Sequence, residues 1–304
     1  MSGDQCRLMR KYLIIIAVII TFYSSSEANV VPIKVDYSTE TAKLRISGEI
    51  TSMDVNQVKN IVQSKRAWGY FAINLDSSGG DIYAAMEIGR LIRKARAKCF
   101  IPQGAKCYSA CVLVLAGAVN RFVGGEVGIH RPYSTYVGKR DYEGTQNEYR
   151  RTETAVRAYL REMNLPEQLF ETMVLVPPEK IRILSYEEVE AFGLSGTDPV
   201  EQETEDAKDA SNYGISKAEL IRRKANLDMV CPKTFLKSPD FYSLPEAQQW
   251  ERINANRDCR QAYMWGLDLP TWKARSARAI DQCSVYKTDR EYIPCYVKVL
   301  RGDR

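Results

Sequence analysis

Histidine is almost absent from this chain of 304 residues, and the single one is His130. Any reaction that needs an imidazole base therefore depends on that ring. The cysteines contain no C-x-x-C pair, which argues against a zinc site. Basic residues form no dense stripe with interleaved aromatics, and the net charge is only +5, so we expect no nucleic-acid partner.

Nucleotide-binding motifs are missing as well. The Gly-Gly turn at residues 79–80 carries neither the G-x-G-x-x-G pattern of dinucleotide-binding folds nor the G-K-[ST] of a phosphate-binding loop. We therefore expect no nucleotide and no cofactor. The hydrophobic fraction is 45%, which is enough for a packed core and excludes wholesale disorder.

The N-terminus has the pattern of a secretory signal peptide. Three basic residues between Arg7 and Lys11 precede an apolar run of twelve residues, and small residues follow at Ser26 and Ala28. The run is shorter than the roughly 20 residues that a spanning helix needs, and no second run of this kind follows. We predict a signal peptide over residues 1–28, cleaved after Ala28, and a periplasmic or secreted mature protein. An uncleaved, membrane-anchored form is the alternative.

Export changes how the cysteines are interpreted, because an oxidising compartment favours disulfides over thiols. Seven cysteines follow the signal peptide: Cys99, Cys107, Cys111, Cys231, Cys259, Cys283 and Cys295. We expect two bridges among the last four. Seven is an odd number, so we expect one free thiol among the first three.

The order of predicted elements indicates an α/β layer fold with right-handed crossovers. Strands are expected at 42–49, 70–75, 97–102, 120–125 and 126–130, with the SSGG segment breaking the second. Helices are expected at 52–65, 81–96, 110–118, 143–163 and 165–175, and a capping box opens one at 184–194.

The chain beyond this fold changes in composition. Acidic residues dominate the stretch around residues 196–214, where apolar residues become sparse. We predict a first domain at 29–200, a polar linker at 201–225, and a small, mostly helical, cysteine-rich region at 226–304.

Three features could carry chemistry, and each also has a plain structural interpretation. Gly79 and Gly80 lie between a predicted strand and a predicted helix. We consider three interpretations of this segment: an oxyanion hole, a phosphate-binding loop, or only a tight turn. Ser109 precedes a predicted apolar helix. It is interpreted either as the N-cap of that helix or as a nucleophile, in which case the backbone amide of the next residue, Ala110, donates to an oxyanion. His130 lies at the end of a predicted strand, before a loop. It is interpreted either as a structural residue or as the general base that a serine nucleophile needs.

These features occur in an order that resembles a known family. The segments "INLDSSGGDIYAAMEIGRLIR", "GAKCYSACVLVLAGAVNRFV", "VGIHRP" and "RILSYEEVEAFGLSGTD" resemble the proteolytic subunit of Clp protease (ClpP) and the wider group of serine peptidases with a crotonase-type fold. The resemblance extends from about residue 40 to 200. It implies repeated ββα units, Ser109 as nucleophile, His130 as general base, and the amides of Gly79 and Ala110 as the oxyanion hole. It also implies a peptide or unfolded-protein substrate and a homo-oligomer.

This chain departs from the family at the position of the third catalytic residue, an aspartate. Ile181 stands there, before "RILS". His130 is then oriented by a backbone carbonyl, by water or by an acid elsewhere. A bridge between Cys107 and Cys111, or one from Cys99, would brace the nucleophile loop. We expect an exported, ATP-independent serine peptidase; a weakly active or inactive protein that binds peptides or a protein partner is the alternative.

Overall fold

The computed structural model divides the chain into two compact units, Met1–Asp198 and Pro199–Arg304. The described residues are 29–38, 40–64, 68–133 and 142–302. Within them, no helix is long and apolar enough to cross a membrane. The predicted signal peptide at 1–28 lies outside the described residues.

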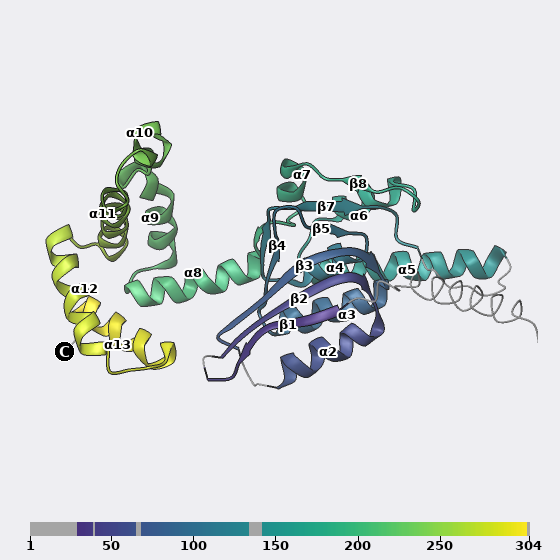
Figure 1. The fold of residues 1–304 in the computed structure, drawn as a ribbon, viewed down its shortest axis with the longest axis horizontal. Helices are drawn as coiled ribbons and strands as arrows, with labels where there is room; N and C mark the ends of the chain where they lie inside the picture. Colours follow the sequence, from purple (N-terminus) through teal and green to yellow (C-terminus); the bar gives the residue numbers. More distant parts are fainter. Residues whose placement is uncertain (1–28, 39, 65–67, 134–141, 303–304) are drawn as a thin grey trace, which may run out of the picture. The chain divides into compact units, whose positions relative to one another are not determined.

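The first unit is an α/β structure built on one nine-stranded sheet (Figure 1). The strands are β1 Asn29–Asp36, β2 Thr41–Ile50, β3 Tyr70–Gly80, β4 Lys98–Ile101, β5 Lys106–Tyr108, β6 Asn120–Val123, β7 Glu126–Ile129, β8 Arg182–Ile183 and β9 Gly196–Thr197. Their order is β8-β7-β5-β3-β4-β6-β9, and β2 joins β3 with β1 beside it.

Strand β3 is the point at which the sheet forks. One edge pairs in parallel with β2 along most of the strand. The other edge pairs first with β4, over Ala72–Asn74, and then with β5, where Ser77 faces Cys107. The end of β3 therefore lies beside the short strand that leads into Ser109.

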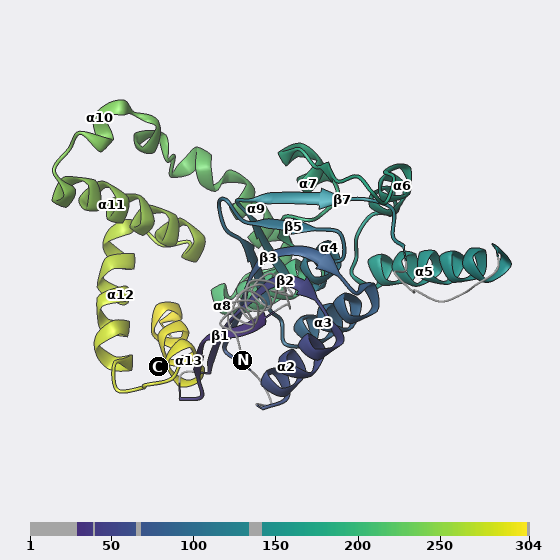
Figure 2. The same ribbon diagram turned by 45° about the vertical axis from the view of Figure 1, so that its right-hand side comes forward.

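The helices of the first unit follow its strands. They are α2 Ser52–Gln63, α3 Ile82–Lys94, α4 Cys111–Gly117, α5 Tyr142–Glu162, α6 Glu167–Leu175 and α7 Tyr186–Ala191. The order β1-β2-α2, β4-β5-α4 and β6-β7-α5 gives three ββα units, with β3 followed directly by α3. Helices α2 and α3 lie side by side (Figures 1 and 2). Every residue of α4 is buried in the core, so the helix after Ser109 cannot shift without disturbing its surroundings.

The strands and helices predicted for this unit are present, but strands β1, β5, β8 and β9 were not predicted, and the expected break in β3 is wrong. The SSGG segment does not break β3, because Gly79 and Gly80 continue the ladder opposite Glu49 and Ile50. Strand β5 was not predicted, since three residues are too few to show a periodic pattern. The predicted capping box is present: Ser185 accepts from the Glu188 amide, and the Glu188 side chain accepts from the Ser185 amide.

The second unit is helical, and it begins earlier than predicted. Its helices are α8 Pro199–Tyr213, α9 Lys217–Val230, η1 Thr234–Lys237, α10 Pro239–Tyr242, α11 Glu246–Trp265, α12 Leu269–Cys283 and α13 Asp289–Arg301. The predicted linker at 201–225 was wrong, because α8 and most of α9 occupy it. Ala210 packs with Leu220 and Met264, and Lys224 forms ion pairs with acidic residues of α8.

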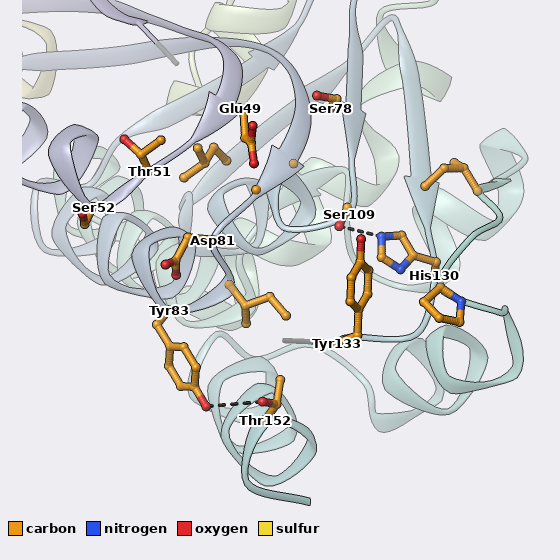
Figure 3. A pocket seen from close by; sticks show the side chains of 16 residues that line it. Glu49, Thr51, Ser52, Ser78, Asp81, Tyr83, Ser109, His130, Tyr133 and Thr152 are labelled. Atoms are coloured by element: carbon orange, nitrogen blue, oxygen red, sulfur yellow. Dashed lines mark hydrogen bonds between the residues drawn. The ribbon is translucent and has the colours of Figure 1, made fainter. Parts of the chain in front are cut away.

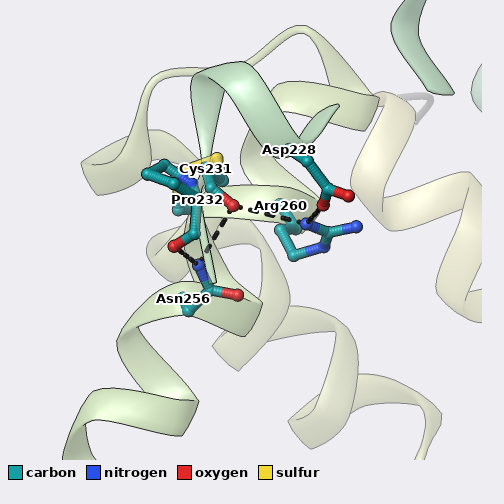
Figure 4. The surroundings of a disulfide bond; sticks show 6 residues. Asp228, Cys231, Pro232, Asn256 and Arg260 are labelled. Atoms are coloured by element: carbon teal, nitrogen blue, oxygen red, sulfur yellow. Dashed lines mark hydrogen bonds and ion pairs between the residues drawn. A yellow bond between two sulfur atoms is a disulfide. The ribbon is translucent and has the colours of Figure 1, made fainter. Parts of the chain in front are cut away.

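Two disulfides join the helices of this unit, as expected from the cysteine count. Cys231–Cys259 joins the end of α9 to α11, and Cys283–Cys295 joins α12 to α13. Around the first bridge, the Asn256 amide donates to the carbonyls of Cys231 and Pro232 (Figure 4). The unit's hydrophobic clusters are small, so these covalent links supplement a limited core.

Candidate active site

Ser109 lies between β5 and α4, and it is not the helix cap. Ala110 occupies the N-cap position of α4, and no side chain caps that helix. Ser109 instead has a φ of +56°, in the left-handed region that residues with a Cβ seldom adopt. Its Oγ lies 2.6 Å from Nε2 of His130 (Figure 3). The structure therefore brings together the two side chains that the sequence singled out, at hydrogen-bond distance.

His130 follows the end of β7 and is only 8% exposed. Its Nδ1 lies 2.9 Å from the carbonyl oxygen of Arg131. A carbonyl can only accept, so Nδ1 of the neutral ring carries the proton and Nε2 is left as an acceptor. Ser109 Oγ–H then donates to Nε2. This is the tautomer that a general base needs.

Arg131 is itself held at two points by the end of α6. Its amide donates to the Val176 carbonyl at 2.8 Å, and its Nε donates to the Val174 carbonyl at 2.8 Å. Of the three alternatives left open for orienting His130, the structure has the backbone carbonyl. The sequence could not indicate which residue orients His130, because every residue has a backbone carbonyl.

Ile181 lies next to this arrangement without entering it. Strands β7 and β8 are antiparallel, with Gly128 opposite Ile183 and Ile129 opposite Arg182. The same register places Ile181 opposite His130. A Cβ added to Gly128 would lie 2.5 Å from Ile181 Cγ2, so the isoleucine packs closely against β7. An apolar side chain thus stands opposite His130 at the position where the family has an acid.

The prediction for the Gly79 amide is not supported. Its N–H donates to Ser77 Oγ at 3.1 Å, and that hydroxyl donates to Gly48 of β2. The amide of Asp81 also points toward β2, because it donates to the Ile50 carbonyl at 2.8 Å. Amides alternate between the two edges of a strand. The amide between them, on Gly80, therefore faces the opposite edge, where Ser109 lies.

Gly79 has a different role, which is close approach. A Cβ at this position would lie 2.6 Å from Ser109 Cβ and 3.1 Å from the Ala110 nitrogen. Its φ of +108° is also one that side-chain-bearing residues rarely adopt. The Ala110 amide makes no hydrogen bond to another described residue. The backbone around Ser109 thus presents the Ala110 N–H from one side, and we infer from the alternation along β3 that the Gly80 N–H faces Ser109 from the other.

Helix α4 is anchored at both ends. At its start, a disulfide joins Cys107 to Cys111 with a Cα–Cα distance of 5.2 Å. At its end, the buried Arg121 guanidinium donates to the carbonyls of Leu115 and Ala116, and the Leu115 carbonyl also accepts from the Ala118 amide. Burial lowers the pKa of Arg121 to about 10, against the opposing effect of Asp198, so the side chain stays charged at neutral pH.

A groove with a volume of about 560 Å³ opens above Ser109 and His130. The charged side chains that line it, among the described residues, are the carboxylates of Glu49 and Asp81. The Tyr133 ring forms one wall, 5.5 Å from the His130 ring between centroids (Figure 3). A second, smaller and mainly apolar pocket adjoins Ser109, and it is lined by Ile82, Ala110, Leu113, Ile129, Pro132, Val156 and Met173.

Comparison with known proteins gives likenesses to solved structures alone. No family model matches the chain, and no curated protein matches it. The 1510-N membrane-bound stomatin-specific protease, solved as a serine-to-alanine mutant, is similar over 50% of this chain and 75% of its own, with 20% identity and a TM-score of 0.39. A mutant of ClpP1 from Listeria monocytogenes is similar over 52% of this chain and 90% of its own, with 18% identity and a TM-score of 0.40.

Proposed function

We propose that this chain is a serine peptidase that cleaves peptide bonds by acyl transfer, with Ser109 as nucleophile and His130 as general base. The observation that carries the proposal is the 2.6 Å contact between Ser109 Oγ and His130 Nε2 in the wall of an open groove. A serine hydroxyl becomes an effective nucleophile when a base within hydrogen-bond reach takes its proton.

The proton moves along one line of contacts. Ser109 Oγ attacks the substrate carbonyl while its proton passes to Nε2 of His130. The Arg131 carbonyl, 2.9 Å from Nδ1, holds the ring in place and stabilises the imidazolium that forms. His130 then gives the proton to the leaving amine. In the second step, a water molecule attacks the acyl-enzyme while its proton passes to His130, and His130 returns that proton to Ser109 Oγ as the acyl group leaves.

The negative charge on the tetrahedral oxygen needs donors that are already in position. We assign this role to the amides of Ala110 and Gly80 in place of the predicted Gly79 amide, which donates to Ser77. Two neutral amides aimed at an oxyanion act strongly because they need no reorganisation during the reaction. Removing one such donor in related chemistry lowers the rate on the order of 10²–10³-fold.

The substrate that this groove favours is a short, unfolded or locally extended peptide. Access from solvent is direct, so the proposal includes no ATP-driven unfolding step. Three disulfides support an oxidising compartment, which agrees with a signal peptide at 1–28 and a periplasmic or secreted location. The family resemblance adds the expectation of a homo-oligomer.

A second candidate function is peptide or partner binding with little catalysis. The observation that favours it is Ile181, which is 42% exposed and stands where a carboxylate would support the base. The groove would then hold an extended segment without cleaving it.

Labelling with a fluorophosphonate separates these two functions, because an activated serine attacks its phosphorus atom and is phosphonylated, with fluoride as the leaving group. We expect the wild type to label once per chain, and neither Ser109→Ala nor His130→Gln to label. Ser78→Ala is the matched control, since Ser78 lines the same groove without contacting His130 through a hydrogen bond in the described structure. A folded wild type that stays unlabelled would overturn the peptidase function and leave the binding function as the candidate.

A further inference from the structure

One disulfide brackets the candidate nucleophile. Cys107 belongs to β5 and Cys111 is the first residue of α4, so the bond closes a ring of five residues with Ser109 at its centre. Both cysteines are fully buried. The disulfide therefore connects β5, which precedes Ser109, to α4, which follows it.

The backbone inside this ring has an unfavourable conformation. Ser109 has a φ of +56°, which persists in a protein only where the surroundings determine it. Its amide donates to the Gly128 carbonyl at 2.9 Å, and its carbonyl accepts from the Val112 amide at 3.0 Å. These two hydrogen bonds fix the residue on the strand side and on the helix side. The disulfide fixes the distance between those sides.

The other two bridges have a different relation to the fold. They join cysteines that are 28 and 12 residues apart, both in the second unit. In the chain-entropy model, stabilisation grows with the logarithm of the loop that a bridge closes. Cys107 and Cys111 are only 4 residues apart, so this bridge restricts the unfolded chain least of the three. Its effect on the local geometry is then its main consequence.

We propose that the Cys107–Cys111 disulfide is a positioning element of the active site, and that catalysis is conditional on its oxidation. The bond keeps Ser109 Oγ against His130 and holds the Ala110 amide at the oxyanion. This inference rests on the proposed peptidase function. A dithiol reductant converts the bridge into two thiols and is itself oxidised to a cyclic disulfide, in a balanced two-electron exchange. Because the bridge is buried, that exchange requires opening of the loop.

The test compares two double variants by fluorophosphonate labelling. Cys107→Ala with Cys111→Ala removes the bracketing bridge, and Cys231→Ala with Cys259→Ala is the control. Labelling rates are measured over a range of reagent concentrations, which separates the maximal rate from the half-saturating concentration. Thermal unfolding gives the fraction folded for each variant.

We expect the first variant to lose at least tenfold in maximal labelling rate, with the half-saturating concentration changed less than twofold. The control should keep the wild-type rate and have the larger decrease in melting temperature. Equal maximal rates for the folded first variant and the wild type would overturn the inference and leave the peptidase function intact. An unlabelled wild type would overturn both.

A measurement on the wild type covers the case in which the first variant does not fold. The wild-type chain is unfolded and refolded in dithiothreitol, and the product is then treated with oxidised glutathione. We expect at least a tenfold lower labelling rate before oxidation and recovery afterwards, while the control variant recovers to the same extent. A reduced protein that is folded and labels at the full rate would again overturn the inference.

Discussion

Replacing Ile181 by aspartate tests whether this site works with a carbonyl in place of an acid. The register of β7 and β8 puts residue 181 opposite His130, and both side chains line the groove. We expect an aspartate there to bring a carboxylate to the His130 ring, whose Nδ1 now donates to the Arg131 carbonyl. The substitution thus adds a charged acceptor without removing any contact of Ser109.

The expected gain is modest because the ring is already oriented. A hydrogen bond to a neutral acceptor is worth about 0.5–1.5 kcal/mol, and one to a charged group about 1.5–3 kcal/mol. The difference of about 1–1.5 kcal/mol corresponds to roughly a 5–10-fold faster reaction, if it is realised only as the imidazolium forms. The ~10⁴-fold effect of losing a triad aspartate includes loss of the correct tautomer. Here the Arg131 carbonyl already selects that tautomer.

The assay is the fluorophosphonate labelling rate as a function of pH. A carboxylate favours the protonated ring, and the base must be neutral, so the acidic limb of the profile should move to higher pH. Ile181→Asn is the matched control, since it has a similar size and no charge, and we expect it to leave the limb in place. A folded Ile181→Asp protein with neither a faster plateau nor a shifted limb would refute the inference that a side chain at position 181 can act on the His130 ring.

Two further predictions concern groups away from the reacting atoms. Burial raises the pKa of the Cys99 thiol to about 12. A chain lacking residues 1–28 should therefore show no thiol reactive toward a disulfide reagent at pH 8 when native, and one when unfolded; three or more in the unfolded chain would mean that a bridge is not formed. Arg121→Met should lower the free energy of unfolding by about 1.5–3 kcal/mol in a urea titration, because the Leu115 and Ala116 carbonyls lose a charged donor while Asp198 keeps its ion pair with Arg93; a loss below about 1 kcal/mol would show that α4 does not depend on this side chain.

Local patterns in the sequence determined much of the first unit. The apolar run at the start of β3, the amphipathic helices and the Ser185 capping box each depend on interactions within a few residues. Ser109 and His130 could also be singled out, since the chain has one imidazole and the serine lies beside an apolar helix. The linker prediction at 201–225 failed, because acid-rich composition looks solvated until Ala210 meets Leu220.

The tertiary structure decided the parts of the site that depend on partners distant in the chain. The Ser77 hydroxyl of β3 donates to the Gly48 carbonyl of β2 and accepts from the Gly79 amide. The amide that we assign to the oxyanion is therefore that of Gly80. The Arg131 carbonyl holds His130 because α6 holds Arg131. The sequence alone fixes which side chains are available for chemistry. Strand pairing and backbone direction decide which atoms they meet, because every residue has the same amide and carbonyl and only the fold aims them.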